Sequence, residues 1–415
     1  MNRRRRALTV LAGEGDAVAP TVAITCAQSS PSADATLNFT ITFSEPVTGF
    51  EVGDFVITNG TKGALGGSGA VYTCDVTPAG MSIVTANVSA GVAIDTAGNE
   101  NTAANEITIT STLTFTDDFA VSKPQWAGAT WSVAGGVAFN TPVPGASVVT
   151  NGEMEAGNPP TGWNAQGTPT TYEASGVQKH GGAASLHVVA DAANEGGMRN
   201  VAVTIGRWYR VSAWKYRIAG GGQMIFSSGM AASVSDSGNT NTWFELSAVD
   251  RATGANPEMY IRQTGASGES YFDDAAVQPL VLTELFRLLP ASVASVTAEV
   301  VVAAMKAGTQ AGLVINVDSP TTPLNFVLAY TDRVTAYLVQ CVNGTYTVKA
   351  SGAITYGAAK ILKVIKNGTT YQLFYDGTQV GADQTINAMN GTYHGLFSTY
   401  PSNTLEDFSL SATPF

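Results

Sequence analysis

Residues that could support catalysis are few, and their spacing forms no catalytic set. Hydrolysis of a glycoside needs two carboxylates that face one cleft. Glu153 and Glu155 form a close pair at i, i+2, but no third carboxylate extends their alternation. Serine and zinc chemistry depend on histidine, and the three histidines, His180, His187 and His394, have no ligand spacing. We therefore predict that the protein is not an enzyme and requires no cofactor.

Aromatic side chains point to binding instead. Sugars present apolar C–H faces that stack on indole and phenol rings, while polar neighbours bond their hydroxyls. A strand over residues 209–216 would carry Arg210, Ser212, Trp214 and Tyr216 on one face. Such a mixed face is unusual for a core, so Trp214, Tyr216 and Arg210 are candidate carbohydrate-binding residues. Further candidates to join this face are Trp163, Tyr172, Trp243 and Tyr260; the alternative is that these aromatic residues are ordinary core.

The composition indicates which elements must position these residues. Charged residues make up 13% of the 415 residues, about half the usual fraction, and 44 are glycine. Helical surfaces need Lys, Glu and Arg, whereas strands and turns accept uncharged Thr, Ser, Asn and Gly. The length suggests about three domains. We therefore predict an all-β, multi-domain chain of β-sandwiches.

Charge and hydropathy exclude several partners. The net charge is −11, and four of the 21 basic residues are Arg3, Arg4, Arg5 and Arg6, so the body is acidic and unsuited to nucleic acid. No apolar run is long enough to span a bilayer, which argues against membrane insertion. The apolar run over residues 7–12 is too short for a signal-peptide core and is followed at once by acidic residues, so we expect no export signal.

Three cysteines in so long a chain exclude a disulfide framework and a multi-cysteine metal cluster. Cys26 and Cys74 are in phase with apolar neighbours, so both are expected to point into one core. There they either form a disulfide or remain two buried thiols. Cys341 is expected to be inert.

Residues 18–112 resemble a bacterial immunoglobulin-like repeat of surface adhesins and phage structural proteins. The resemblance rests on Phe43-Ser-Glu-Pro-Val-Thr-Gly-Phe50, Asp54-Phe-Val-Ile-Thr-Asn-Gly60 and Ile94-Asp-Thr-Ala-Gly-Asn99. It implies a small sandwich that acts as a spacer or attachment point. In some adhesin repeats Glu45, Asp54, Asp95 and Asn99 could supply oxygen ligands to calcium; the alternative is that they bond local backbone in turns.

Residues 146–280 resemble the family 4 and 9 carbohydrate-binding modules, which are galactose-binding-like jelly rolls. The matching pieces occur in order, among them Val148-Val-Thr-Asn-Gly-Glu-Met-Glu155, Gly206-Arg-Trp-Tyr-Arg-Val-Ser-Ala-Trp214 and Tyr271-Phe-Asp-Asp-Ala-Ala-Val277. The resemblance implies a glycan cleft and often one structural calcium, with Glu155 and Asp273 or Asp274 as candidate ligands. The alternative is that these carboxylates are solvated at a strand edge.

The flanking segments resemble two parts of one concanavalin A-like or laminin G-like sandwich. The first part contains Phe115-Thr-Asp-Asp-Phe119 and the second contains Lys363-Val-Ile-Lys-Asn-Gly368 and Glu406-Asp-Phe-Ser-Leu410. We predict that residues 113–145 and 281–415 form one split sandwich into which the jelly roll is inserted. Concanavalin A-like hydrolases usually carry Glu, Asp and Glu at alternate positions of one strand, and no such run exists here.

Adhesive domains without an export signal predict a structural protein on the virion surface of a tailed bacteriophage, as a head fibre, decoration or tail-associated protein. In this interpretation residues 1–17 form an arm whose Arg3, Arg4, Arg5 and Arg6 anchor it to other virion proteins. Host-surface glycans are the expected ligands, and we expect a homo-oligomer. The alternative is a secreted adhesin or polysaccharide-binding accessory protein, extracellular or on the bacterial surface. A glycosidase or lyase without recognisable residues is the third hypothesis.

Overall fold

A computed structural model describes residues 16–412, except Met81, Leu113, Pro124, Ala129, Ser237, Asn239, Ser292 and Ala388. The predicted arm residues Arg3 to Arg6 lie outside these described residues. The chain divides into two compact units, residues 1–115 and 116–415. Within the described residues nearly every regular element is a strand, and no helix there is long and apolar enough to cross a membrane. The prediction of an all-β chain of several sandwiches is confirmed.

The first unit contains two three-stranded antiparallel sheets, in the orders β1-β2-β4 and β3-β5-β6. Strand β2 alternates buried Leu37, Phe39 and Ile41 with solvent-facing Asn38 and Thr42, because successive side chains of a strand point to opposite faces. The buried residues of both sheets form one core. The strands are β1 (Val22–Cys26), β2 (Leu37–Val47), β3 (Phe55–Thr58), β4 (Gly60–Pro78), β5 (Ser82–Val88) and β6 (Ile107–Ser111).

Cys26 and Cys74 are free thiols in this unit. Cys26 on β1 and Cys74 on β4 both lie opposite Phe39 of the intervening strand β2, from its two sides. Two strand spacings separate them by about 9–10 Å, whereas disulfide-bonded residues have Cα atoms within about 7 Å. The structure therefore favours the second alternative, two separate thiols, and burial raises the pKa of each.

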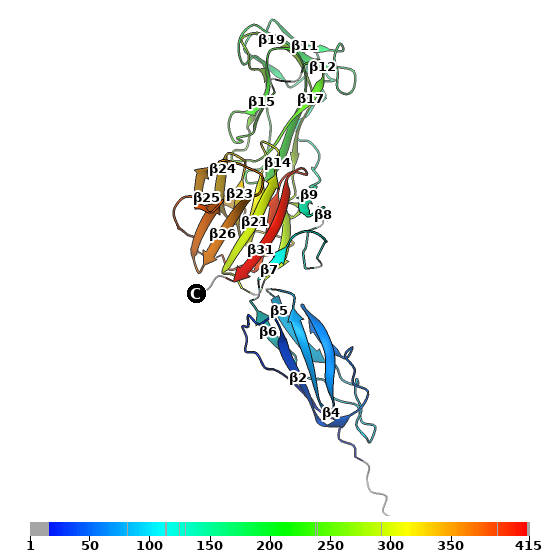
Figure 1. The fold of residues 1–415 in the computed structure, drawn as a ribbon. Coiled ribbons are helices and arrows are strands. Elements are labelled where there is room, and N and C mark those ends of the chain that lie inside the picture. The colour runs from blue at the N-terminus through cyan, green and yellow to red at the C-terminus, as the bar shows by residue number, and fades with distance from the viewer. Residues whose placement is uncertain are drawn as a thin grey trace, which may run out of the picture. The chain divides into compact units, whose positions relative to one another are not determined.

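The second unit contains a jelly roll of two five-stranded sheets. One sheet has the order β10-β13-β18-β15-β16 and the other the order β11-β12-β19-β14-β17, and their inner faces share one core. In Figure 1 the long strands β14 and β17 extend from the neighbouring sandwich into the jelly roll. The strands are β10 (Asn164–Gln166), β11 (Thr171–Ser175), β12 (Ser185–Ala190), β13 (Gly196–Asn200), β14 (Trp208–Ala219), β15 (Gly222–Phe226), β16 (Ser233–Asp236), β17 (Trp243–Arg251), β18 (Glu258–Gln263) and β19 (Gly268–Pro279).

The remainder of the second unit is a larger sandwich of a six-stranded sheet, β20-β30-β22-β23-β24-β25, and a nine-stranded sheet. The larger sheet has the order β28-β27-β26-β21-β31-β9-β8, with β29 on β27 and β7 on β31. Strands from residues 115–140 thus lie in the same sheet as strands from residues 296–412.

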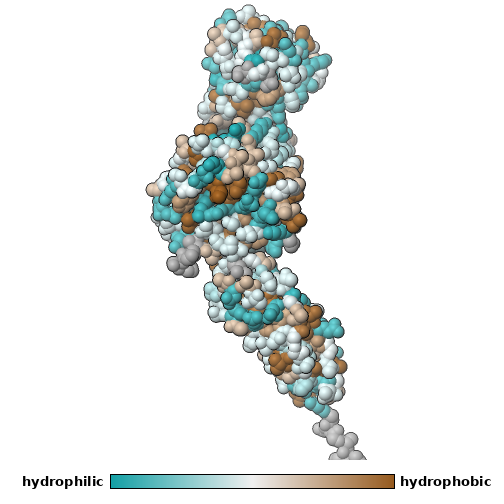
Figure 2. All heavy atoms as spheres, in the orientation of Figure 1, coloured by the Kyte–Doolittle hydropathy of each residue, from teal (hydrophilic) through white to brown (hydrophobic). Residues whose placement is uncertain are grey.

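The elements of the sandwich are β7 (Phe115–Asp117), β8 (Trp131–Ala134), β9 (Val137–Asn140), the 3-10 helix η1 (Leu282–Glu284), β20 (Phe286–Pro290), β21 (Val296–Ala304), β22 (Ala311–Val317), β23 (Phe326–Thr331), β24 (Thr335–Val342), β25 (Thr345–Ala353), β26 (Lys360–Asn367), β27 (Thr370–Tyr375), β28 (Thr378–Gln379), β29 (Gln384–Thr385), β30 (Tyr393–Ser398) and β31 (Thr404–Ala412). Figure 2 shows an apolar patch on this sandwich where Figure 1 places β21 and β26, and Ile361 of β26 is 40% exposed.

The jelly roll packs on the six-stranded sheet through apolar side chains. Trp208, Val249 and Leu280 of the jelly roll join a cluster with sandwich residues that include Val339 and Phe397. Strands β22 and β23 are buried almost throughout, because one face meets the opposite sheet and the other is covered by this cluster. The sequences of β22 and β23 are therefore nearly continuous apolar runs, without the alternation of a half-exposed strand.

Candidate functional site

Six rings from four strands and one loop gather on one outer sheet face of the jelly roll. On β14, Val211, Ala213 and Lys215 point inward and are buried, so Trp214 and Tyr216 point outward. Tyr216 lies opposite Trp243 on β17 and Tyr271 on β19. We call the set of His180, His187, Trp214, Tyr216, Trp243 and Tyr271 the aromatic face.

The rings of the aromatic face contact one another in sequence. His180 stacks on Trp214 with centroids 3.8 Å apart, and its ring meets Trp243 edge-on at 5.5 Å. Tyr216 lies 5.7 Å from Trp243 and 6.4 Å from Tyr271. His187 stacks on Tyr271 at 4.3 Å. These contacts make a continuous row of rings across the sheet. Tyr271 is 3% exposed, so the C–H faces of sugar rings would meet the more accessible rings of His180, Trp214, Tyr216 and Trp243.

Carboxylates border this row and supply hydrogen-bonding groups. His187 lies between Glu269, 3.0 Å away, and Glu173, 3.6 Å away. Glu245 accepts a hydrogen bond from Arg210 at 2.9 Å. Arg210 also lies over the Tyr400 ring of the sandwich at 5.7 Å. The predicted residue Arg210 is therefore at the edge of the aromatic face, where the jelly roll meets the sandwich.

The three carboxylates predicted as calcium ligands hold the loop that carries His180. Both Glu155 oxygens accept hydrogen bonds from the backbone N–H of Ala183, at 2.8 and 2.9 Å. Asp273 accepts from the N–H groups of His180 and Gly181, and Asp274 pairs with the His180 ring at 2.6 Å. Asp273 is fully buried, and this burial raises its pKa to about 6.

N–H donors already satisfy these carboxylates, and a donor dipole opposes a cation at the same oxygen. Within the described residues, the His, Cys, Asp and Glu side chains that cluster closely enough to hold a metal are Asp16, Glu45 and Asp95, in the first unit. The calcium ion predicted at Glu155, Asp273 and Asp274 therefore stays a prediction, and in this geometry the three carboxylates bond backbone and the His180 ring. They position His180 on Trp214 instead.

Three predicted members of the aromatic face lie elsewhere: Trp163 and Tyr172 face the core, and Tyr260 is on the opposite sheet. Trp163 is 3% exposed in the jelly-roll core and donates its indole N–H to the Asn151 carbonyl, so it is a core tryptophan. Tyr172 packs against the same core, and burial raises the pKa of its phenol. Tyr260 lies on β18 of the opposite sheet and donates to Glu258. Including these three in one binding face was wrong.

The residues named as possible calcium ligands in the immunoglobulin-like unit mostly form hydrogen bonds within local turns. Asp95 accepts N–H groups of Ala97 and Asn99 and the Asn99 amide, and the Asn99 side chain does most to lower its pKa. Glu45 lies beside Asp95 and Asp16. Asp54 accepts the Glu51 N–H in a separate turn. The interpretation as turn residues therefore accounts for Asp54, Asp95 and Asn99.

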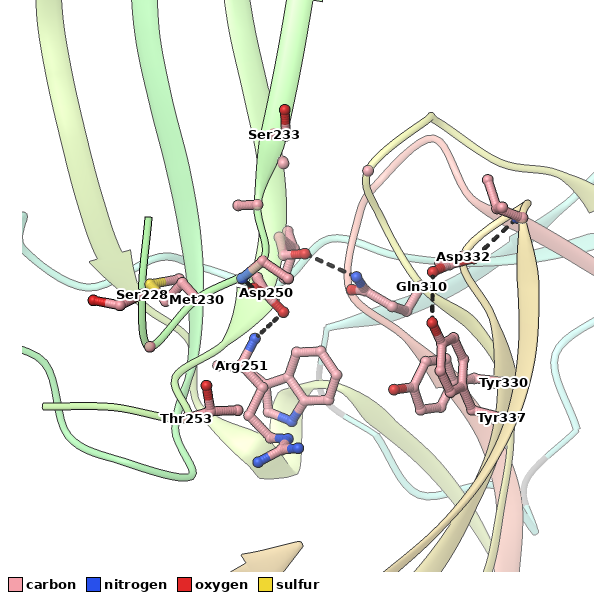
Figure 3. Close-up of a pocket in the computed structure, with 18 of the residues that line it drawn as sticks. Ser228, Met230, Ser233, Asp250, Arg251, Thr253, Gln310, Tyr330, Asp332 and Tyr337 are labelled. Atoms are coloured by element: carbon pink, nitrogen blue, oxygen red, sulfur yellow. Dashed lines mark hydrogen bonds between the residues drawn. The ribbon is translucent and has the colours of Figure 1, made fainter. Parts of the chain in front are cut away.

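A second candidate site lies between the jelly roll and the sandwich, and we call it the junction cleft (Figure 3). Its volume is about 560 Å³. Jelly-roll residues form one wall and sandwich residues the other; the lining includes Trp208, Ser228, Met230, Ser233, Asp250, Arg251, Gln310, Tyr330, Asp332 and Tyr337. Sequence reasoning missed this site, because Asp250 and Tyr330 belong to different domains.

Sequence reasoning also missed three members of the aromatic face: His180, His187 and Tyr271. Strand alternation could have identified two of them. His187 falls between inward Leu186 and Val188, and Tyr271 precedes the buried Phe272. The two strands would still have had to be assigned to the sheet of β14.

Comparisons with known proteins agree with part of this picture. Solved structures with a similar arrangement include the tandem CBM22-1-CBM22-2 of Paenibacillus barcinonensis Xyn10C, with 12% identity over 66% of this chain and 98% of that one and a TM-score of 0.29. They also include the carbohydrate-binding module CBM66 of Bacillus subtilis, with 15% identity, coverage of 33% and 87%, and a TM-score of 0.26. The GH43 protein BlXynB of Bacillus licheniformis matches with 11% identity, coverage of 94% and 96%, and a TM-score of 0.23.

Likenesses at this level assign no function to this chain. A search among curated proteins finds no significant match. Residues 16–111 match the family described as a Bacterial Ig-like domain, so the resemblance inferred from the sequence of the first unit is confirmed.

Proposed function

We propose that this chain is a non-enzymatic protein that binds glycans through the aromatic face of its jelly roll. The observation that carries the proposal is the continuous row of rings from His180 and Trp214 to Tyr271 and His187. Aromatic rings and flanking carboxylates together match the two surfaces of a sugar, its apolar C–H face and its hydroxyls.

The carboxylates of the aromatic face support binding without catalysis. Glu245 is held by Arg210, and Glu269 lies within hydrogen-bonding distance of His187. A glycosidase needs one carboxyl group that protonates the leaving group and a second that attacks or activates water. Arg210 and His187 occupy oxygens of Glu245 and Glu269 that these two roles would need. We therefore expect no release of reducing sugar from any polysaccharide that the protein binds.

Replacement of Trp214 by Ala tests the proposal. The variant loses the indole at one end of the row, on which His180 stacks, and an aromatic stacking contact contributes about 0.5–1.5 kcal/mol beyond its buried area. We expect affinity for the best glycan of an array to fall about tenfold or more. Tyr260→Ala, an outward-facing ring on the opposite sheet, is the matched control and should bind normally. Equal binding by the folded Trp214→Ala variant would reject the aromatic face as the site.

We propose a tailed-phage virion as the setting, and a bacterial cell surface as the alternative. The immunoglobulin-like unit suits both, since such repeats resemble parts of adhesins and of phage structural proteins. In the virion the Arg3–Arg6 arm would anchor the chain to its neighbours, and chains that lack residues 1–14 should stay soluble but fail to join particles. Immunogold labelling of purified particles and of intact cells distinguishes the two settings.

A further inference from the structure

The junction cleft is formed by two parts of the chain that are firmly packed together. Trp208 of β14 lies 5.4 Å from Phe397 and 6.3 Å from Tyr330, both in the sandwich. Two hydrogen bonds of 2.8 Å cross the junction as well: Val249 donates to the Gly308 carbonyl, and the Gln310 amide donates to the Val249 carbonyl. The walls are thus held in place before any ligand arrives, which lowers the entropy cost of binding. A volume of about 560 Å³ is within the range of small-molecule sites.

The charge in the cleft is negative. Asp250 accepts hydrogen bonds from the N–H groups of Ala231 and Arg251, and Asp332 accepts from backbone N–H groups and the Tyr337 hydroxyl. In the described part of the chain, neither carboxylate has a cationic side chain within 4 Å. The Arg251 guanidinium lies over the Tyr346 ring at 4.3 Å. Burial also raises the pKa of Asp250.

These carboxylates favour a ligand that donates hydrogen bonds and disfavour an acid. Hydroxyl and ammonium groups can donate to Asp250 and Asp332, whereas a carboxylate or phosphate would meet two like charges that are offset only in part by Arg251, which also lines the cleft.

One side chain supplies an unused polar group. The Tyr330 ring stacks on Tyr337 with centroids 5.1 Å apart. Its hydroxyl has no hydrogen-bond partner among the described residues, and burial raises the pKa of this phenol. In Figure 3 the Tyr330 side chain points from the sandwich toward the strand that carries Asp250 and Arg251. A ligand hydroxyl can replace water as the hydrogen-bond partner of this group.

We propose that the junction cleft is a second glycan site and that it binds a short saccharide without acid groups, neutral or amino-substituted. The indole of Trp208 and the two stacked tyrosines provide apolar surface, and Asp250, Asp332 and the Tyr330 hydroxyl bond the sugar hydroxyls. This site is separate from the aromatic face, so each can be tested without the other.

The first measurement is hydrogen–deuterium exchange of the full chain with a panel of trisaccharides. The neutral probes are cellotriose, xylotriose and mannotriose, the amino-substituted probe is chitosan trimer, and the acidic probe is trigalacturonate. At least one neutral or amino-substituted probe should slow exchange in residues 227–233 and 250–253. Protection of these segments by none of them, or by trigalacturonate equally well, would overturn the proposal.

Two variants then test the site with the probe that binds. Tyr330→Phe removes only the unpartnered hydroxyl, so the fold should be as stable as before and the affinity should fall about three- to tenfold, the range for one hydrogen bond. Ser233→Trp fills the cleft from an exposed position and should abolish protection. Its matched control is Ser235→Trp, exposed on the same strand but outside the cleft lining. Unchanged affinity in both Tyr330→Phe and Ser233→Trp would refute the proposal.

Trp214→Ala separates this proposal from the proposed function of the aromatic face. The variant should keep protection at residues 227–233 even where it loses glycan binding at the aromatic face. Loss of protection at both places in a folded Trp214→Ala variant would show that the cleft is no separate site.

Discussion

Residues 281–415 should not fold without residues 113–145, because the two segments share one sheet and one core. The edge of β31 pairs with β9 and β7, both from the earlier segment. Asn140, which is fully buried, donates its amide to the carbonyls of Glu284 at 2.7 Å and Ser398 at 2.8 Å. The guanidinium of Arg287, a residue that is 4% exposed, lies over the rings of Phe119 and Trp126. All of these contacts are absent from residues 281–415 alone.

The loss is comparable with the whole stability of a domain. Phe119 is fully buried and Trp131 is 9% exposed, and removal of a buried aromatic side chain costs about 3–5 kcal/mol. Two such losses amount to about 6–10 kcal/mol, whereas a domain has about 5–15 kcal/mol in total. Unpaired strand edges and the exposed Arg287 lower the stability further.

Covalent rejoining should restore folding. The Gly145 N–H donates to the Pro279 carbonyl at 2.8 Å, so the two ends of the jelly roll are adjacent and a short Gly-Ser linker can replace it. The free-energy cost of closing this loop changes by only about 0.6 kcal/mol for each doubling of its length. The assay is thermal unfolding followed by circular dichroism, together with amide dispersion by NMR. A cooperative transition from residues 281–415 alone would refute the split domain. The rejoined chain lacks Trp208, Val249 and Leu280, which cover the six-stranded sheet, so it should unfold at a lower temperature than the full chain.

Two further predictions concern ionisable groups. Burial lowers the pKa of His394 to about 3, so its stabilising contribution is complete above the unfolded value of about 6.5 and is lost as the pH falls toward 3. When the pH falls from 7.5 to 5, the free energy of unfolding of wild type should drop by about 2 kcal/mol more than that of His394→Gln. Urea unfolding measures both values, and parallel pH profiles of the two proteins would contradict the prediction. Glu155→Gln should lower the melting temperature, since it weakens the acceptor for Ala183 and Ala184, whereas EDTA should leave wild type unchanged. Stabilisation by added Ca²⁺ that Glu155→Gln abolishes would instead establish a metal at this loop.

The alternation of residues along a strand predicted well which side chains point outward and which point into the core. It placed Trp214 and Tyr216 outward on β14, where the structure has them, because the period of two is fixed by backbone geometry. The same period of two buries Leu37, Phe39 and Ile41 in the first unit. Tyr260 could not be placed this way, since nothing local states that β18 pairs with β13 and β15 on the far side of the core. Trp163 lies outside the strands, just before β10, where alternation does not apply.

Sites built from two domains are harder still to read from sequence. Asp250 and Tyr330 are 80 positions apart and meet only because Trp208 and Val249 pack on the six-stranded sheet.

The role of the histidines was missed for a different reason. From their spacing we expected no metal or nucleophile chemistry. His180 and His187 instead contribute flat rings to the aromatic face, a role that depends on their shape and not on ligand geometry.

Each candidate site has one tryptophan on the same side of β14. Trp208 in the cleft and Trp214 in the aromatic face are six residues apart on β14, an even separation that puts both side chains on one face. At about 3.3 Å per residue the two tryptophans are about 20 Å apart, with Arg210 and the Tyr400 ring between them. The strand and the packed junction fix this spacing, so a glycan that reaches both sites would bind the second one at high effective concentration. A trisaccharide confined to one site would lack that gain, and glycan length should therefore affect affinity in wild type more strongly than in Trp214→Ala.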